Sequence, residues 1–181
     1  NTTSKALKSN NPNLKIGGPV TCQADGIPAF LNWAKSNNVK VDFVSTHLYP
    51  TDPAVVSGNM PVIFKQALSQ VAASPFPSLP VFLTEYNDGL FGSPPMHDYP
   101  FAASYVVKLF ASTNGILPLM SWWTFSDVFE EQGFPAQEFD KPTSTGWGLL
   151  SASGIPKPVY RAFQLLHQAA SMRLPVHLSN T

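Results

Sequence analysis

The chain has 181 residues, of which 44% are hydrophobic and 12% are charged, and its formal net charge at pH 7 is zero. This length permits one domain or part of a larger one, and the charged share is about half of the usual value, so no nucleic-acid interface built from clustered Lys and Arg is expected. No apolar run reaches the roughly 18 residues that a membrane-spanning helix needs, so no membrane interaction is expected either.

Hydrophobic periodicity and turn-forming residues predict the end of a helix followed by four strand–helix units. Strands are predicted at residues 14–16, 41–47, 81–85 and 117–125, and helices at 2–9, 28–36, 61–73, 101–112 and 158–170. A long loop is expected at 126–147. Residues 1–172 are assigned to one part-domain and 173–181 to an irregular tail. Strands that alternate with helices indicate an α/β fold with a parallel sheet.

Four units cannot close a barrel of eight, which needs about 250 residues. Two architectures remain: an open α/β sheet, or the second half of a (β/α)8 TIM barrel, strands five to eight, incomplete by itself. The predicted helix at 2–9 favours the half-barrel, because it looks like the end of a unit whose strand lies upstream. The segment Gly17-Gly18-Pro19 lacks the further glycines and the lysine of a phosphate-binding loop, which argues against a nucleotide-binding open sheet.

A carboxylate ends the third predicted strand. The apolar run 81–83 leads to Glu85, just before the turn-forming Asn87-Asp88-Gly89, and the chain contains only four Glu. In barrels of alternating strands and helices, side chains at the carboxyl ends of strands form the active site. Glu85 is therefore the candidate catalytic residue, the alternative being a structural carboxylate paired with Lys or Arg.

The remaining chemistry-bearing residues predict neither a metal site nor a cofactor. The four His, at positions 47, 97, 167 and 177, lack the close pair spacing of a zinc site. Cys22 is the only cysteine, which is typical of a buried small apolar residue and excludes an internal disulfide. The opening Asn1-Thr2-Thr3 is an N-glycosylation acceptor, and a start without Met indicates a processed or clipped chain. A secreted or lysosome-like glycoprotein is the resulting expectation.

Segments spread over nearly the whole chain resemble glycoside hydrolase family 39, which contains β-xylosidases and α-L-iduronidases. In chain order they are KIGGP at 15–19, VDFVSTHLYP at 41–50, LTE at 83–85, SWWTFSDVFEE at 121–131, GWGLL at 146–150 and KPVYRAF at 157–163. They correspond to the fifth to eighth strands of the family's barrel and to the segment that leads into its last helix.

The resemblance implies a retaining glycosidase that acts on a carbohydrate, with a β-xyloside as the first expectation. Such enzymes use two carboxylates about 5–5.5 Å apart, one as nucleophile and one as acid/base. Glu85 matches the family's nucleophile. The expected sugar-site residues are His47 and Tyr49 as hydrogen-bond donors near Glu85, Glu130 for sugar hydroxyls, and Trp122 and Trp147 as aromatic walls. Because side chains alternate along a strand, Trp123 is expected to face the helices if Trp122 faces the site.

One part of the family's pattern does not occur in this sequence. The acid/base Glu of the family follows Asn at the end of the fourth strand, and no Asn-Glu pair is present here. The proton donor is therefore expected upstream of residue 1, and the expected partner is the missing N-terminal half-barrel or a second copy of the chain. Two alternatives stay open: a carbohydrate-binding half-barrel without catalysis, and a half-barrel that self-associates.

Overall fold

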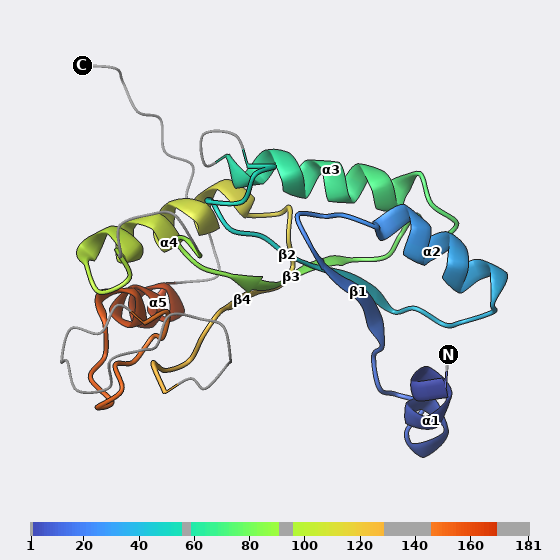
Figure 1. Cartoon of the computed structure of the whole chain (residues 1–181), viewed down its shortest axis with the longest axis horizontal. Coiled ribbons are helices and arrows are strands. Elements are labelled where there is room, and N and C mark those ends of the chain that lie inside the picture. Colours follow the sequence, from blue (N-terminus) through green and yellow to red (C-terminus); the bar gives the residue numbers. More distant parts are fainter. Residues whose placement is uncertain (1, 56–58, 91–95, 129–145, 170–181) are drawn as a thin grey trace.

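The computed structural model of the protein describes residues 2–55, 59–90, 96–128 and 146–169 (Figure 1). Four parallel strands form one sheet in the order β1 (Gly17–Cys22), β2 (Phe43–His47), β3 (Val81–Tyr86) and β4 (Met120–Trp122). A doubly wound sheet reverses its strand order at a switch point, whereas consecutive parallel neighbours form the wall of a barrel. The α/β half-barrel architecture is thus confirmed.

A helix follows each strand, and one more helix precedes β1. The helices are α1 (Thr2–Asn10), α2 (Ile27–Ser36), α3 (Met60–Ala72), α4 (Pro100–Thr113) and α5 (Pro158–Gln168). All but α1 carry Pro in the first turn, where a missing N–H costs no hydrogen bond. Helix α2 packs on α3 and α4 on α5, so the helices form a row along the sheet, and α1 lies apart beside the start of β1 (Figure 1).

The two faces of the sheet differ in burial. The face toward the helices carries Val44, Val81 and Leu83, which are buried in the core. Alternation along the strands directs Phe43 and Phe82 to the opposite face, where their rings stack with centroids 4.8 Å apart and both side chains stay half-buried. This second face is the one that lines the interior when such a sheet closes into a barrel.

The first strand lies later in the sequence than predicted. It covers Gly17–Cys22, where it pairs with β2 from Gly17↔Phe43 to Cys22↔His47, and the predicted range 14–16 is outside it. Gly and Pro disfavour strands in general, which is why local propensity places the end of the predicted strand before Gly17. The pairing itself requires the glycine, since a Cβ on Gly17 would lie 2.3 Å from the Phe43 ring.

The fourth strand is shorter than predicted, and the chain leaves it for a different partner. After Trp122, backbone bonds run from Thr124 N–H to the Trp147 carbonyl (3.2 Å) and from Leu149 N–H to the Thr124 carbonyl (3.0 Å). The other predicted strands and helices agree with the structure to within a few residues. Most of the predicted loop at 126–147, namely residues 129–145, and the predicted tail at 173–181 lie outside the described residues.

Candidate active site

The carboxyl ends of β2 and β3 bring three of the predicted site residues together. His47 and Glu85 are register partners, and the Leu48 N–H donates to the Glu85 carbonyl at 3.1 Å. Tyr49 lies in the loop two residues after His47, and the side chains of both residues reach Glu85.

Both oxygens of the Glu85 carboxylate are in contact with side chains of the β2 segment, one through a hydrogen bond and the other through a close approach of an imidazole nitrogen. The Tyr49 hydroxyl donates to Oε1, and Nδ1 of His47 lies 3.1 Å from Oε2. The side chain of Glu85 is 24% exposed, so the carboxylate is fixed by its partners while an approaching molecule can still reach it. Hydrogen bonds to an ionised acceptor are stronger than neutral ones, which gives this carboxylate a defined orientation.

The loop after β2 holds Tyr49 in place and keeps it protonated. Burial, and then the Glu85 carboxylate, raise the pKa of Tyr49 far above its usual range, so its hydroxyl acts as a donor. Its backbone N–H donates to Oδ2 of Asp52 at 2.8 Å, and the Asp52 N–H donates back to the Tyr49 carbonyl at 3.0 Å. Burial raises the pKa of Asp52, and the charge of Glu85 raises it further against the lowering effect of the Tyr49 N–H.

An aromatic wall adjoins Tyr49, which donates to the Glu85 carboxylate, and is built by Trp123 and Trp147. The Trp123 ring meets Tyr49 edge to face, with centroids 6.4 Å apart, and lies 5.3 Å from the ring of Trp147. Trp147 is only 6% exposed, whereas Trp123 is half-buried. Trp123 therefore presents the accessible surface of this wall, and Trp147 backs it.

The expected orientation of the two neighbouring tryptophans is wrong. Trp122 packs edge to face on Tyr86 of β3 (5.3 Å between centroids) and on Phe163 of α5 (6.1 Å), so it belongs to the layer between sheet and helices. Pairing of Trp122 with Tyr86 in the β3–β4 ladder fixes this orientation. Alternation then directs Trp123 to the other face, where its ring meets Tyr49.

Asn87 contributes to the site in a way that the sequence did not reveal. Its buried side chain donates from Nδ2 to the carbonyls of Trp123 and of Trp147, the latter at 3.0 Å. It thus joins the segment after β3 to both halves of the aromatic wall. In the sequence, the only indication of this role is that Asn87 lies two residues after Glu85. Asn is also common in turns, so its presence there is equally well explained by the predicted turn at 87–89.

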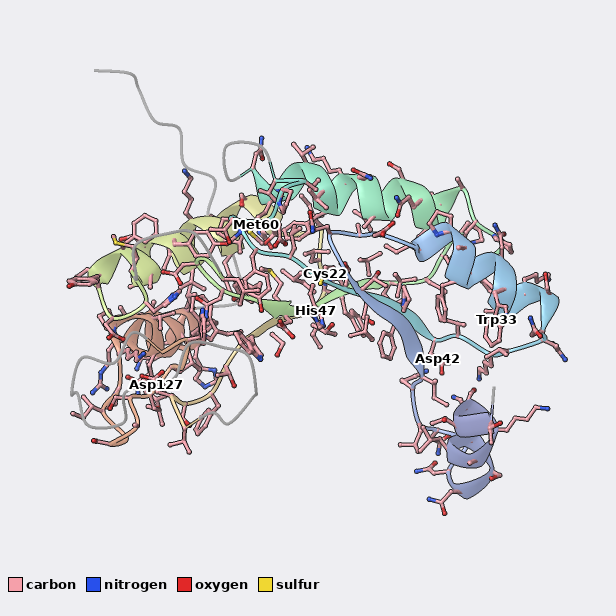
Figure 2. The ribbon with its side chains drawn as sticks, in the orientation of Figure 1. Cys22, Trp33, Asp42, His47, Met60 and Asp127 are labelled. Carbon is pink, nitrogen blue, oxygen red and sulfur yellow. The ribbon has the colours of Figure 1, made fainter. Side chains whose placement is uncertain are left out.

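Cys22 lies at the end of β1 beside His47 (Figure 2) and is exposed, contrary to the expectation of a buried residue. Partial burial raises the pKa of its thiol, and the negative charges of Asp52 and Glu85 raise it further. Glu130 lies outside the described residues. Within the described ranges, no group of three or more His, Cys, Asp or Glu could hold a metal ion, and no helix there is both long and apolar enough to cross a membrane.

Fold and site together define a class: half of a (β/α)8 barrel with a carboxylate at the carboxyl ends of its strands. Within that class, the sequence model of Glycosyl hydrolases family 39 matches residues 1–179, and the chain belongs to this family. It is 36% identical to a β-xylosidase of Caldicellulosiruptor saccharolyticus over 97% of this chain and 37% of the relative. A β-xylosidase of Geobacillus stearothermophilus is 34% identical over 89% of this chain and 34% of the relative.

A solved structure agrees with these relatives. The family 39 β-xylosidase from Caulobacter crescentus superposes with a TM-score of 0.78 at 34% identity, over 91% of this chain and 35% of that one. The chain thus spans about a third of the length of the proteins it matches.

Proposed function

We propose that this chain supplies the nucleophile half of a retaining glycosidase that acts on β-xylosides. The observation that supports this role is the Glu85 carboxylate at the carboxyl ends of adjacent barrel strands, where one oxygen accepts from the Tyr49 hydroxyl and the other lies 3.1 Å from Nδ1 of His47. The substrate class is proposed from the β-xylosidase names of the two similar proteins.

The proposed reaction has two displacements. One Glu85 oxygen attacks the anomeric carbon, the glycosidic C–O bond breaks, and a carboxylic acid from the first half of the barrel protonates the leaving oxygen. Water, deprotonated by that same group, then attacks the anomeric carbon of the glycosyl ester and releases Glu85 as a carboxylate. Tyr49 and His47 hold the attacking oxygens in position through both steps, which lowers the cost of reaching the reactive geometry.

The sugar ring is proposed to lie against Trp123, with its apolar C–H surface on the indole, and Trp147 behind it. Aromatic side chains combine a large apolar surface with a defined geometry, which suits such a contact. Glu130 is proposed to accept hydrogen bonds from sugar hydroxyls, as the resemblance to the family implies.

The proposed partner of this chain is the N-terminal half-barrel with strands one to four. The sheet described here ends at β1 on one side and β4 on the other, and strands at open edges have unpaired backbone groups that favour association. We expect the segment 1–181 expressed alone to sediment as an associated species. A cooperatively melting monomer would contradict this, and a stoichiometric dimer would indicate that a second copy can replace the first half.

Covalent labelling tests the nucleophile directly. The full-length protein is incubated with a 2-fluoro-β-xyloside that carries a good leaving group. The protein is then digested with a protease, and the modified peptide is sequenced by mass spectrometry. We expect the label on Glu85 and none in the Glu85→Gln variant, whose turnover should fall by about 1,000-fold or more. Labelling of another carboxylate, or full activity of Glu85→Gln, would refute the assignment. Xyloside binding without any turnover by the native protein would favour the non-catalytic alternative.

A further inference from the structure

Lys157, the residue just before α5, has a buried side chain surrounded by polar groups. It is 6% exposed, and its Nζ contacts Oδ1 of Asp98 at 2.6 Å, Oδ2 of Asp127 at 2.8 Å and the carbonyl of Gly146 at 2.6 Å. Lysine is almost never fully buried unless it is paired, so these contacts explain its position.

The partners of Lys157 come from three different parts of the chain. Asp98 precedes α4, Asp127 follows β4 and lies beside α5 (Figure 2), and Gly146 begins the segment that returns to β4. Asp127 is fully buried, so removing the ammonium would leave its charge without this counter-ion. Lys157 is therefore the point at which these segments are joined.

Asp127 in turn holds the segment 146–148 very closely. It accepts from the Gly148 N–H at 2.8 Å, and a Cβ on Gly146 would lie 2.4 Å from its carboxyl carbon. A Cβ on Gly148 would lie 2.3 Å from the carbonyl carbon of Ser126. Only glycine permits so close an approach, and the residue between these two glycines is Trp147.

Trp147 transmits this placement to the accessible wall of the site. Its carbonyl accepts from Asn87 Nδ2 at 3.0 Å, from Trp122 Nε1 at 3.1 Å and from the Thr124 N–H at 3.2 Å, and its ring adjoins Trp123. A shift of the 146–148 segment would thus move the support behind Trp123.

We propose that Lys157 is a positioning residue that sets the sugar-binding wall through Asp127, Gly146 and Trp147. This rests on the proposed function, in which Trp123 contacts the sugar. Lys157 touches neither the carboxylate of Glu85 nor Trp123 in any described contact, so its effect falls on substrate affinity and not on the chemical steps.

The test is a double-mutant cycle in the full-length protein, with KM and kcat for an aryl β-xyloside and the Kd of a hydrolysis-resistant thioxyloside as readouts. Lys157→Met should raise KM and Kd by about 10-fold with kcat changed less than about 3-fold, and Lys157→Arg should restore most of the affinity. In a Trp123→Ala background, Lys157→Met should produce little further loss, because the accessible ring that it positions through Trp147 is gone. Lys108→Met, an exposed lysine on α4, is the matched control.

The outcomes separate this proposal from the proposed function. Unchanged KM and Kd in Lys157→Met, or losses that add fully to those of Trp123→Ala, would overturn the positioning role even if stability falls. If Lys157→Met does not fold, the Asp98→Asn variant provides the test, because the Asp98 side chain is 23% exposed and its replacement disturbs the core less. Asp98→Asn alone should raise the Kd of the thioxyloside. Added to Trp123→Ala, it should leave the Kd of that variant unchanged. Full activity of Glu85→Gln would refute the proposed function instead.

Discussion

The Tyr49 hydroxyl donates a hydrogen bond to the Glu85 carboxylate across the carboxyl ends of β2 and β3. These two residues are 36 positions apart, yet a parallel ladder with His47 opposite Glu85 brings them together. Because the pKa of Tyr49 is raised by burial and by Glu85, the hydroxyl keeps its proton and can donate at neutral pH.

Tyr49→Phe should lower kcat for an aryl β-xyloside by about 10- to 100-fold. A hydrogen bond to a charged group contributes about 1.5–3 kcal/mol, and each 1.4 kcal/mol corresponds to about a factor of 10 in rate. Tyr105→Phe is the matched control, since the Tyr105 hydroxyl contacts the sulfur of Met60 in the helical layer. A rate for Tyr49→Phe equal to that of the control would show that this donor does not act on the nucleophile.

The two neighbouring tryptophans should give opposite phenotypes. Trp123→Ala should weaken binding of a thioxyloside by about 10-fold, within the range for loss of one aromatic contact, with little effect on melting. Trp122→Ala should lower stability by about 3 kcal/mol or more through the cavity it leaves between Tyr86 and Phe163, with a smaller effect on Kd. Titration and thermal melts of both variants are the measurements, and exchanged phenotypes would refute the orientation described here.

Cys22 reports on the negative charge around Glu85. Since the pKa of its thiol is raised, it holds less thiolate than an ordinary thiol at pH 8.5, and iodoacetamide should modify it more slowly than glutathione at that pH. The difference should shrink as the pH rises through the raised pKa. Asp52→Asn should accelerate the modification of Cys22 by removing one of the charges that raise its pKa. Asp25→Asn, in the loop between β1 and α2, is the control and should not change the rate. Quantifying the Cys22 peptide by mass spectrometry gives the rates.

The ion pair between Lys8 and Asp42 should attach α1 to the sheet in a pH-dependent way. Burial raises the pKa of Asp42, but the bonds from Lys8 (2.9 Å) and from the Ile16 N–H outweigh this effect and leave the pKa below its usual value. A lowered folded-state pKa means that the stabilisation is complete above the unfolded pKa of about 4 and is lost as the pH falls through the folded value.

Hydrogen exchange of the α1 peptide checks this. At pH 7, the amides of the α1 peptide should exchange up to about fivefold faster in the Lys8→Met variant than in the wild type, since an ion pair of this kind contributes about 1 kcal/mol or less to stability. The ratio of the two rates should fall toward one below about pH 4. Lys5→Met, on the same helix, is the control, and a ratio that does not change with pH would exclude the ion pair as the cause.

Sequence patterns predicted the structure correctly where local chemistry determines it. The order of the elements follows from alternating apolar runs and turn residues, and the position of Glu85 follows from a strand that ends before Asn87. The juxtaposition of Glu85 with His47 and Tyr49 also agrees with the expectation, while their catalytic roles remain proposals. Strand β1 was misplaced because Gly17 and Pro19 disfavour a strand locally, whereas pairing with β2 overrides that preference.

Features that depend on pairing between distant segments could not be predicted from the sequence. The direction of Trp122 depends on its pairing with Tyr86, and alternation alone leaves two solutions. The roles of Asn87 and Lys157 consist of contacts with carbonyls and carboxylates 11 to 60 residues away, which leave no periodic pattern in the sequence.

The described side-chain partners of Glu85, Tyr49 and His47, lie on one short segment at and after the end of β2. If the proposed function holds, a barrel divided ahead of its fifth strand would leave a preassembled nucleophile on one fragment and the proton donor on the other. Such a division suits a split-enzyme reporter, in which sugar hydrolysis begins only when the two fragments are brought together.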